Sequence, residues 1–422
     1  MAISVIEEAR RCLNCKVPQC QKGCPISTPI PKIIRMMLDG RLDVAGWALF
    51  ENNPLTTVCC LICNHENQCE GHCVLGRKGS PVHFSAIENY ISSTYSNKMT
   101  AGPAPSNGIR TAIIGAGPAG LTIAVLLARK GYQVTIFDGK DKIGGILRYG
   151  IPEFRLPKSV LDDFEYRHLH LKGIKFRPNT SIGTALTIDD LFRDGYKAIF
   201  VGTGVWQPNL LHIRGESLGH VHFAINYLIN PDSYRLGERV VVIGAGNAAM
   251  DVARTAIRKG SRYVTCVSRP AAAAASRMEI EYAELEGVNI VYLKAPVEIT
   301  DEGVILQDVV EDGEGGFRPV PGSETLYPAD SVIISISQGP RSRLTSTTEG
   351  LAANERGLLI ADEYGRTTHP GIFAAGDVVN GARTVVEAVA RSKTVAEAMD
   401  AYMQGRSPSD PVPAPKDAGR HV

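Results

Sequence analysis

The hydrophobic pattern divides the chain into three differently built regions. In residues 1–98, apolar positions recur with helical spacing at Ile30–Leu38 and Leu42–Asn52. From Arg110 onward, short apolar strands alternate with helical segments, which is typical of parallel α/β sheets. The same alternation starts afresh near Arg239. The pattern therefore predicts an α/β protein in which a helical N-terminal domain precedes two parallel-sheet folds.

Segments with few large apolar residues separate and follow these regions. Residues 99–109 are rich in Pro, Gly, Ala and Ser and are predicted to form a linker, and residues 406–422 are predicted to be a disordered tail. The uncharged stretch Thr111–Ala128 has the length of a marginal membrane span. Its glycines and Pro118 instead favour a strand, a turn and a helix.

Two glycine-rich turns lie between a strand pattern and a helix pattern. The first, GAGPAG, separates the strand Arg110–Ile114 from the helix Leu121–Lys130, and the second, GAGNAA, separates Arg239–Ile243 from Met250–Lys259. In such turns the first glycine permits the bend, the second lets a pyrophosphate approach, and the helix N-terminus offers amide donors. Both contexts predict Rossmann-like dinucleotide sites, and a turn that only packs a helix on a strand is the alternative. The predicted cofactor-binding residues are Gly115, Gly117, Pro118, Ala119 and Gly120 in the first turn and Gly244, Gly246, Asn247 and Ala248 in the second.

The side chains that follow the second strand of each fold distinguish the two ligands. Asp138 follows Gln133–Phe137, where a carboxylate accepts hydrogen bonds from ribose hydroxyls and repels a 2′-phosphate. The equivalent place in the second fold holds Ser268 and Arg269, and a guanidinium suits a 2′-phosphate. A solvated loop arginine is the alternative for Arg269. The sequence thus predicts an adenosine without a 2′-phosphate in the first fold and an NADP-type nucleotide in the second.

Nine of the ten cysteines lie between Cys12 and Cys73. The first four have the spacing C-x2-C-x4-C-x3-C followed by proline, and a later group has C-x5-C-x3-C. Since Glu7 and Glu8 stand where a signal peptide needs apolar residues, a reducing cytoplasm is predicted, and the cysteines are expected to bind metal. Zinc, a disulfide or redox-sensing role, and plain buried thiols are the alternatives. Two attached dinucleotide sites favour iron–sulfur clusters over zinc.

The net charge is +1, because 45 basic residues face 44 acidic ones. A chain without a basic excess is not expected to bind nucleic acid or an anionic membrane surface. His168 and His170 have H-x-H spacing without a third ligand and are predicted to be surface or strand histidines.

These motifs together resemble those of a known family. RCLNCKVPQCQKGCP, QCEGHC, GAGPAG, GGILRYGIPEFRLPK, GAGNAAMD and GIFAAGDVVNGARTVVEAVA are similar to segments of glutamate synthase small subunits, from about Arg10 to Met403. The family includes one of the subunits of bifurcating ferredoxin:NADP oxidoreductases and the small subunits of dihydropyrimidine dehydrogenases. The resemblance implies two 4Fe-4S clusters in residues 1–98, FAD in 110–235 with 340–405, and NAD(P)H in 236–339.

The resemblance also implies ligands residue by residue. The expected iron ligands are Cys12, Cys15, Cys20 and Cys73 for one cluster, and Cys24, Cys63, Cys69 and Glu88 for the other. For Glu88, an exposed helical glutamate is the alternative, and Cys59 and Cys60 are expected to pack near a cluster. Further FAD residues are expected to be Gly144, Gly145, Arg148, Thr203, Gly376, Asp377 and Thr384. Arg277 joins the NADP site, but Pro270 replaces the family's usual second arginine, which weakens the NADP preference.

The implied function is electron input into a larger enzyme. NADPH or NADH would reduce FAD, and two 4Fe-4S clusters would carry electrons to a catalytic partner subunit of the glutamate synthase or dihydropyrimidine dehydrogenase type. Hydride transfer needs no side-chain base, so no catalytic residue is predicted. A subunit of a ferredoxin-linked bifurcating transhydrogenase is the main alternative. A stand-alone disulfide reductase, disfavoured because only Cys266 follows Cys73, and a non-enzymatic iron–sulfur scaffold are minor ones.

Overall fold

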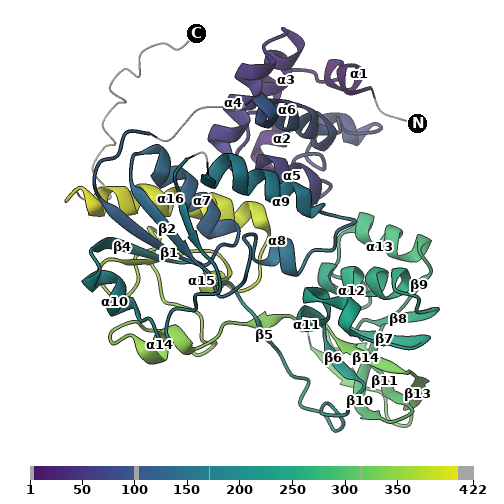
Figure 1. Cartoon of the computed structure of the whole chain (residues 1–422). Coiled ribbons are helices and arrows are strands. Elements are labelled where there is room, and N and C mark those ends of the chain that lie inside the picture. The colour runs from purple at the N-terminus through teal and green to yellow at the C-terminus, as the bar shows by residue number, and fades with distance from the viewer. Residues whose placement is uncertain (1–3, 99–103, 171, 314–315, 407–422) are drawn as a thin grey trace.

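The computed structural model describes residues 4–98, 104–170, 172–313 and 316–406 (Figure 1). The predicted tail, apart from Arg406, and the first half of the predicted linker lie outside these residues. The elements of the N-terminal domain are helical: α1 (Val5–Arg10), α2 (Gln19–Lys22), α3 (Ile30–Leu38), α4 (Leu42–Asn52), α5 (Thr56–Ile62), a 3-10 turn (Val74–Arg77) and α6 (Phe84–Lys98). Helices α3 and α4 have the predicted bounds. Ile30, Ile33, Ile34 and Met37 form one buried face of α3, as their spacing requires.

The first α/β fold is built on a parallel five-stranded sheet in the order β16-β4-β1-β2-β3. Helix α7 packs against this sheet and alongside the long helix α16, which also contacts the sheet, and this explains why the side chains of α7 are almost all apolar (Figure 1). No helix among the described residues is long and apolar enough to cross a membrane. The bounds are β1 (Arg110–Ile114), β2 (Gln133–Phe137), β3 (Lys175–Arg177), β4 (Tyr196–Val201), β16 (Ile372–Ala374), α7 (Pro118–Arg129), α10 (Ile188–Arg193), α14 (Arg343–Thr347), α15 (Asp377–Asn380) and α16 (Val385–Met403).

The second fold repeats this plan with a sheet in the order β6-β14-β7-β8-β9. Strand β6 (Val221–Phe223), which lies within the range expected for FAD, pairs with β14 in this sheet. The other elements are α11 (Ala224–Ile229), a 3-10 turn (Pro231–Ser233), β7 (Arg239–Ile243), α12 (Asn247–Arg258), β8 (Tyr263–Val267), α13 (Arg277–Leu285), β9 (Val288–Val291) and β14 (Ser331–Ile334). An antiparallel sheet is added from β10 (Lys294–Thr300), β11 (Gly303–Glu311), β12 (Phe317–Pro319) and β13 (Thr325–Pro328).

The two folds are joined by a short antiparallel pair, β5 (Gln207–Pro208) with β15 (Gln338–Gly339), seen between them in Figure 1. The remaining helices are α8 (Ile146–Tyr149), α9 (Lys158–Phe164) and the π-helical turn Glu165–His170. His168 in that turn is buried against Phe50 of α4, so the expectation of a surface or strand histidine was wrong.

The N-terminal domain and the first fold share one hydrophobic core. Phe50, Leu55, Val58 and Cys59 belong to the same buried cluster as the apolar residues of β1 and α7. The second fold has separate cores on either face of its sheet. The cysteine-rich domain is therefore built onto the first fold and is not a free appendage.

Candidate cofactor sites

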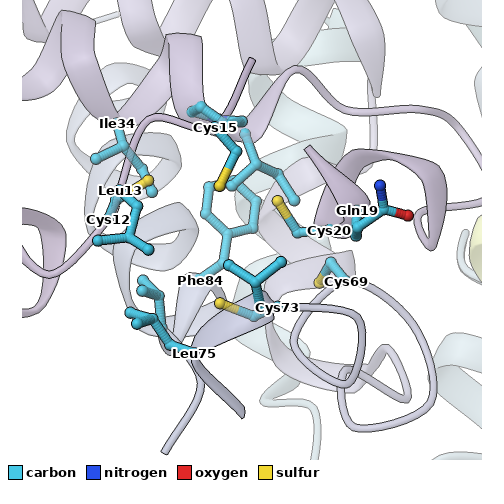
Figure 2. Close-up of a pocket in the computed structure, with 14 residues that line it drawn as sticks. Cys12, Leu13, Cys15, Gln19, Cys20, Ile34, Cys69, Cys73, Leu75 and Phe84 are labelled. Carbon is cyan, nitrogen blue, oxygen red and sulfur yellow. The ribbon is translucent and has the colours of Figure 1, made fainter. Parts of the chain in front are cut away.

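The thiols of Cys12, Cys15, Cys20 and Cys73 face one pocket in the N-terminal domain (Figure 2). Its walls are apolar and include Leu13, Ile34, Leu75 and Phe84. The pKa of Cys20 is raised to about 11, mainly by burial and also by the neighbouring Cys73, Cys12 and Cys15 thiols, while a hydrogen bond from the Gln21 backbone opposes the rise. Burial also raises the pKa of Cys12, beside Cys15 and Cys73. Such a set of mutually close, half-buried thiols becomes thiolate when a cation balances the charge, which fits a metal cluster.

A second group contains Cys24, Cys63, Cys69 and Glu88. Burial raises the pKa of Cys69, and the carboxylates of Glu88 and Glu70 and the thiol of Cys24 add to the effect. A hydrogen bond with Cys59, followed by burial and the charges of Cys59, Glu88 and Cys69, raises the pKa of Cys63. Cys69 also lines the pocket of the first group, so the two groups adjoin (Figure 2).

Glu88 lies on α6 with only 7% of its surface exposed. Its carboxylate accepts a hydrogen bond of 2.7 Å from the Thr56 hydroxyl, and burial raises its pKa to about 7. A buried carboxylate among thiols has the chemistry of a metal ligand, whereas an exposed helical glutamate does not.

The thiols spread around a space and do not meet at one point. Among residues 4–98 and the other described ranges, no three His, Cys, Asp or Glu side chains lie close enough together to hold a single metal ion. All ten cysteines are free thiols, and Cys59, Cys60 and Cys266 are buried. The donor set of seven thiols and one carboxylate fits polynuclear iron–sulfur clusters, which are wider than one ion and are held by thiolates.

The first glycine turn is shaped by contacts that exclude side chains. Gly115 has φ +107°, and a Cβ there would lie 2.5 Å from the carbonyl oxygen of Gly202. A Cβ on Gly120 would lie 1.9 Å from the oxygen of Gly115, whereas one on Gly117 would meet no atom closer than 4.0 Å. Helix α7 begins at Pro118, followed by Ala119, and Gly117 provides no side-chain cap. The first-turn amides and the open side of Gly117 thus form a cradle that suits a pyrophosphate.

Asp138 lies beside this cradle at the end of β2. Its half-buried carboxylate accepts hydrogen bonds from the amides of Ala116 (2.6 Å) and Lys140 (2.8 Å). Burial raises its pKa, and these two amides oppose the rise. The carboxylate therefore fixes the glycine turn at the place predicted for the adenosine ribose.

The other residues expected at FAD converge on the same turn. Gly145 (φ +53°) approaches Gly117, and Gly376 (φ +80°) lies next to Ala119. Gly144 precedes Gly145 with φ +117°, and Thr203 follows Gly202 after β4. Sequence positions far apart in the chain therefore surround one cradle.

The polar side chains of this group are already fixed. Arg148 donates to the Ile143 carbonyl (2.7 Å) and to Asp162 (2.6 Å). Asp377 accepts from the Arg383 amide at 3.2 Å, and burial raises its pKa to about 6. Thr384 caps α16 in a reciprocal capping box with Glu387.

The second glycine turn has the same geometry. A Cβ on Gly244 would lie 2.3 Å from the carbonyl oxygen of Ser335, and one on Gly246 would meet nothing within 4 Å. Helix α12 begins at Asn247, followed by Ala248, and the Asn247 side chain accepts from the Ser276 amide at 2.9 Å. This turn too therefore has a shape that suits a pyrophosphate.

The polar residues expected at the NADP ribose lie on the loop after β8. The Ser268 hydroxyl donates to the Pro270 carbonyl at 3.0 Å. The exposed Arg269 stacks on the ring of Phe317 at 4.9 Å. Arg277, the first residue of α13, pairs with Glu281 and is 85% exposed. Both arginines are thus at the surface of the second fold.

Sequence reasoning missed a buried ionic cluster between the two folds. Arg155, from the loop between α8 and α9, contacts Asp251 on α12 and Glu279 on α13. The only sequence signal was a pair of charges in apolar surroundings, Arg155 between Phe154 and Leu156 and Asp251 between Met250 and Val252.

Comparisons with known proteins agree with this arrangement. Residues 109–403 match the family model of pyridine nucleotide-disulphide oxidoreductases, and residues 2–100 match that of dihydropyrimidine dehydrogenase domain II, 4Fe-4S cluster. The glutamate synthase [NADPH] small chain of Azospirillum brasilense is 34% identical over 95% of this chain and 89% of its own length. The chain belongs to the glutamate synthase small-chain family. The NAD-dependent dihydropyrimidine dehydrogenase subunit PreT of Escherichia coli K12 is also similar, with 32% identity over 96% of this chain and 95% of its own length.

Solved structures show the same fold outside the N-terminal domain. FprA of Mycobacterium tuberculosis in complex with NADPH matches with a TM-score of 0.59 and 20% identity, covering 72% of this chain and 85% of that one. Thioredoxin reductase of T. acidophilum matches with a TM-score of 0.53 and 22% identity over 70% and 98%.

The predicted family and α/β fold class are confirmed by these matches. This chain is an FAD-dependent NAD(P)H oxidoreductase with a 4Fe-4S domain, and it acts as an electron-transfer subunit. These two relatives are, by name, a small chain and a subunit.

Proposed function

We propose that this chain passes electrons from NADPH through FAD and two 4Fe-4S clusters to a catalytic partner subunit of the glutamate synthase or dihydropyrimidine dehydrogenase type. The observation that carries the proposal is the core shared by the cysteine-rich domain and the first nucleotide fold. A shared core fixes the distance between the flavin cradle and the thiol groups, as electron transfer between them requires.

We propose the two ligand sets that the family resemblance implies. Cys12, Cys15, Cys20 and Cys73 bind one cluster, and Cys24, Cys63, Cys69 and Glu88 bind the other. In support, the charges that raise the pKa of Cys20 come from the first set, and those acting on Cys63 include Glu88 and Cys69. Cys73 thereby joins cysteines at the start of the chain.

The second set is proposed as the one that receives electrons from FAD. Cys63 of this set packs against the shared core, whereas Cys24 and Cys69, like Cys12, Cys20 and Cys73, pack in the core of the N-terminal domain. Lys393 of α16 donates to Asn52, whose amide donates to Thr28, and the Cys24 thiol donates to that same hydroxyl. Helix α16 of the flavin fold is thus linked to a ligand of the second set.

The bound flavin supplies the chemistry by which a hydride pair leaves as single electrons. The protein contributes placement and electrostatics. The glycine cradles hold both pyrophosphates, and Asp138 and Asp377 orient the flavin nucleotide at two ends. The capped N-terminus of α16 presents backbone amides, which stabilise negative charge.

Catalysis of the complete reaction is assigned to the complex with the partner. The isolated chain should reduce artificial dyes with NADPH but should not turn over glutamine plus 2-oxoglutarate, or uracil. NADPH added without oxygen should bleach the flavin bands of the purified chain. Turnover of such a substrate by this chain alone, or a chain without bound flavin, would contradict the proposal.

The ligand sets are tested by paramagnetic resonance of the reduced protein. Cys73→Ala and Cys12→Ala should damage the same cluster signal, although the two residues lie far apart in the sequence. Cys266→Ala, which removes a buried thiol from β8, is the matched control and should leave both signals intact. Loss of different signals in the two variants would refute the interleaved assignment.

We also propose the cytoplasm as the location of the protein, and the free thiols support it, because cysteines stay reduced in that compartment.

A further inference from the structure

The loop between α8 and α9 crosses from the first nucleotide fold to the second. It follows the flavin-side glycines Gly144 and Gly145 and carries Phe154 and Arg155. The Arg155 guanidinium donates to both carboxylate oxygens of Asp251 (3.0 and 2.8 Å), and its Nε lies 2.9 Å from Glu279. All three side chains are less than 15% exposed, so solvent screens these contacts poorly.

The loop itself is held rigidly before it reaches the second fold. The ammonium of Lys158 donates to the carbonyls of Leu147, Ile151 and Leu156, and burial lowers its pKa to about 8. One cation thus ties both ends of the loop together. Arg155 is therefore presented on a fixed support.

The contacts on the second fold lie at its nucleotide end. Asp251 is one helical turn after Asn247, which begins α12 next to the glycine cradle. Glu279 lies in the first turn of α13, which starts with Arg277. Arg155 therefore holds together the two helix ends that frame the predicted NADPH site.

Further contacts surround this pair. Arg254 also pairs with Glu279 and lies over the Phe154 ring at 4.5 Å, and Arg258 lies over the same ring at 4.2 Å. Burial raises the pKa of Asp251 to about 6, although Arg155 opposes the rise. Arg254 also opposes the rise, and Glu279 adds to it.

The chain segments that connect the two folds restrain their relative orientation less than these ion pairs do. Strands β5 and β15 that join them have two residues each, and folds joined in this way rotate relative to each other unless an interface fixes them. We propose that Arg155, with Asp251 and Glu279, is a latch that sets the angle between the two nucleotide folds so that the nicotinamide meets the flavin. The latch rests on the proposed transfer from NADPH to FAD. Arg155 is a positioning residue, because it contacts neither predicted cradle.

The test measures flavin reduction in the holoprotein by stopped-flow absorbance at saturating NADPH. Arg155→Ala should slow this step at least tenfold, while the bound FAD, its reduction by dithionite and the Kd of NADP+ change less than threefold. A latch acts on the geometry of transfer, so kcat should fall far more than KM rises. The deuterium isotope effect with NADPH labelled at the transferred position should also increase.

Control variants separate the latch from general damage. Arg258→Ala removes a neighbouring arginine that stacks on Phe154 but pairs with Glu286, and its rate should stay within twofold of the wild type. Arg155→Lys keeps the charge but loses the forked guanidinium group, so its rate of flavin reduction should lie between the rates of Arg155→Ala and Arg258→Ala. If Arg155→Ala does not fold, Asp251→Asn keeps the shape and should show the same slowing.

Two kinds of outcome have different meanings. An Arg155→Ala protein that reduces its flavin at the wild-type rate or faster, or that changes only in KM, would overturn the latch. A wild-type protein whose flavin NADPH does not reduce would instead overturn the proposed function. The dithionite control shows whether the flavin itself is competent.

Discussion

The two nucleotide folds share a backbone design but differ in how each is attached to the rest of the molecule. In both turns, the carbonyl of the residue that follows a neighbouring strand excludes any side chain on the first glycine, and the second glycine faces open space. The first fold, however, shares a hydrophobic core with the cysteine-rich domain, whereas the second has its own cores. The second fold meets the first at Arg155 through buried ion pairs.

This difference has a physical consequence. Apolar burial is non-directional and holds two domains as one unit, whereas ion pairs fix an orientation only while every partner is present. The flavin fold and the clusters must keep a constant separation, but NADPH has to enter and leave. The structure uses a permanent junction for the first requirement and a directional one for the second.

The largest effect is expected where a crowded first glycine is compared with an open second glycine of the two turns. Gly115→Ala places a methyl group 2.5 Å from a backbone oxygen, in a conformation with φ +107°. We expect a loss of about 2–4 kcal/mol of unfolding free energy and little bound FAD. Gly246→Ala, with open space around it, should keep its stability and FAD but bind NADPH more weakly. Thermal unfolding and the ratio of flavin to protein absorbance measure both. Equal destabilisation by the two changes would refute the distinction.

The second prediction concerns the junction with the cysteine-rich domain. His168 stacks on Phe50 with ring centres 4.8 Å apart and lies 4.6 Å from Phe164. The pKa of His168 is lowered from 6.5 to about 4, mainly by burial and next by the positive charge of Lys172. Asp163 raises the pKa, and Arg167 lowers it by a smaller amount. Because the folded state favours the neutral ring, the contribution of His168 to the free energy of unfolding is complete above pH 6.5. It is lost as pH falls toward 4, up to about 3 kcal/mol.

The measurement is unfolding free energy against pH for two substitutions in the same helical turn. His168→Phe should lose part of the decline between pH 6.5 and 4. His170→Gln changes a 62% exposed ring and should leave the decline as in the wild type. An unchanged profile in His168→Phe would show that the junction does not depend on a neutral histidine.

Local sequence patterns predicted the bounds of several helices and strands well, but contacts between residues far apart in the sequence were not predicted. Strands β1, β2 and β7 have the predicted bounds because apolar runs next to glycine turns define them locally. Helices α7 and α12 start three residues earlier than predicted, since the turn's last residues already adopt helical geometry. Arg155 could not be found, because its partner Asp251 is 96 residues away and depends on how the folds pack.

The third prediction concerns the carboxylate beside the glycine turn of the first fold. Asp138→Ala removes a carboxylate that accepts two backbone amides beside the first cradle. Two donors would lose their partner, and we expect FAD affinity to fall by about 1–3 kcal/mol, or roughly fivefold to 150-fold. Titration of the apoprotein with FAD measures this change. Asp141→Ala, an exposed carboxylate that contacts Tyr149, is the control, and a comparable loss in it would remove Asp138 from the role.

The smallest effect is expected at the basic end of the second fold. Arg269 stacks on Phe317 and is exposed, so a 2′-phosphate there gains a charge-assisted hydrogen bond partly screened by water. Such a bond contributes about 1.5 kcal/mol at the low end, which corresponds to roughly a tenfold preference for NADPH over NADH. Arg269→Ala should abolish this preference in steady-state dye reduction. Arg262→Ala, at the opposite end of β8 and paired with Glu238, should preserve it. Equal efficiency of the wild type with both nucleotides, or an unchanged ratio in Arg269→Ala, would show that the nucleotide choice is made elsewhere.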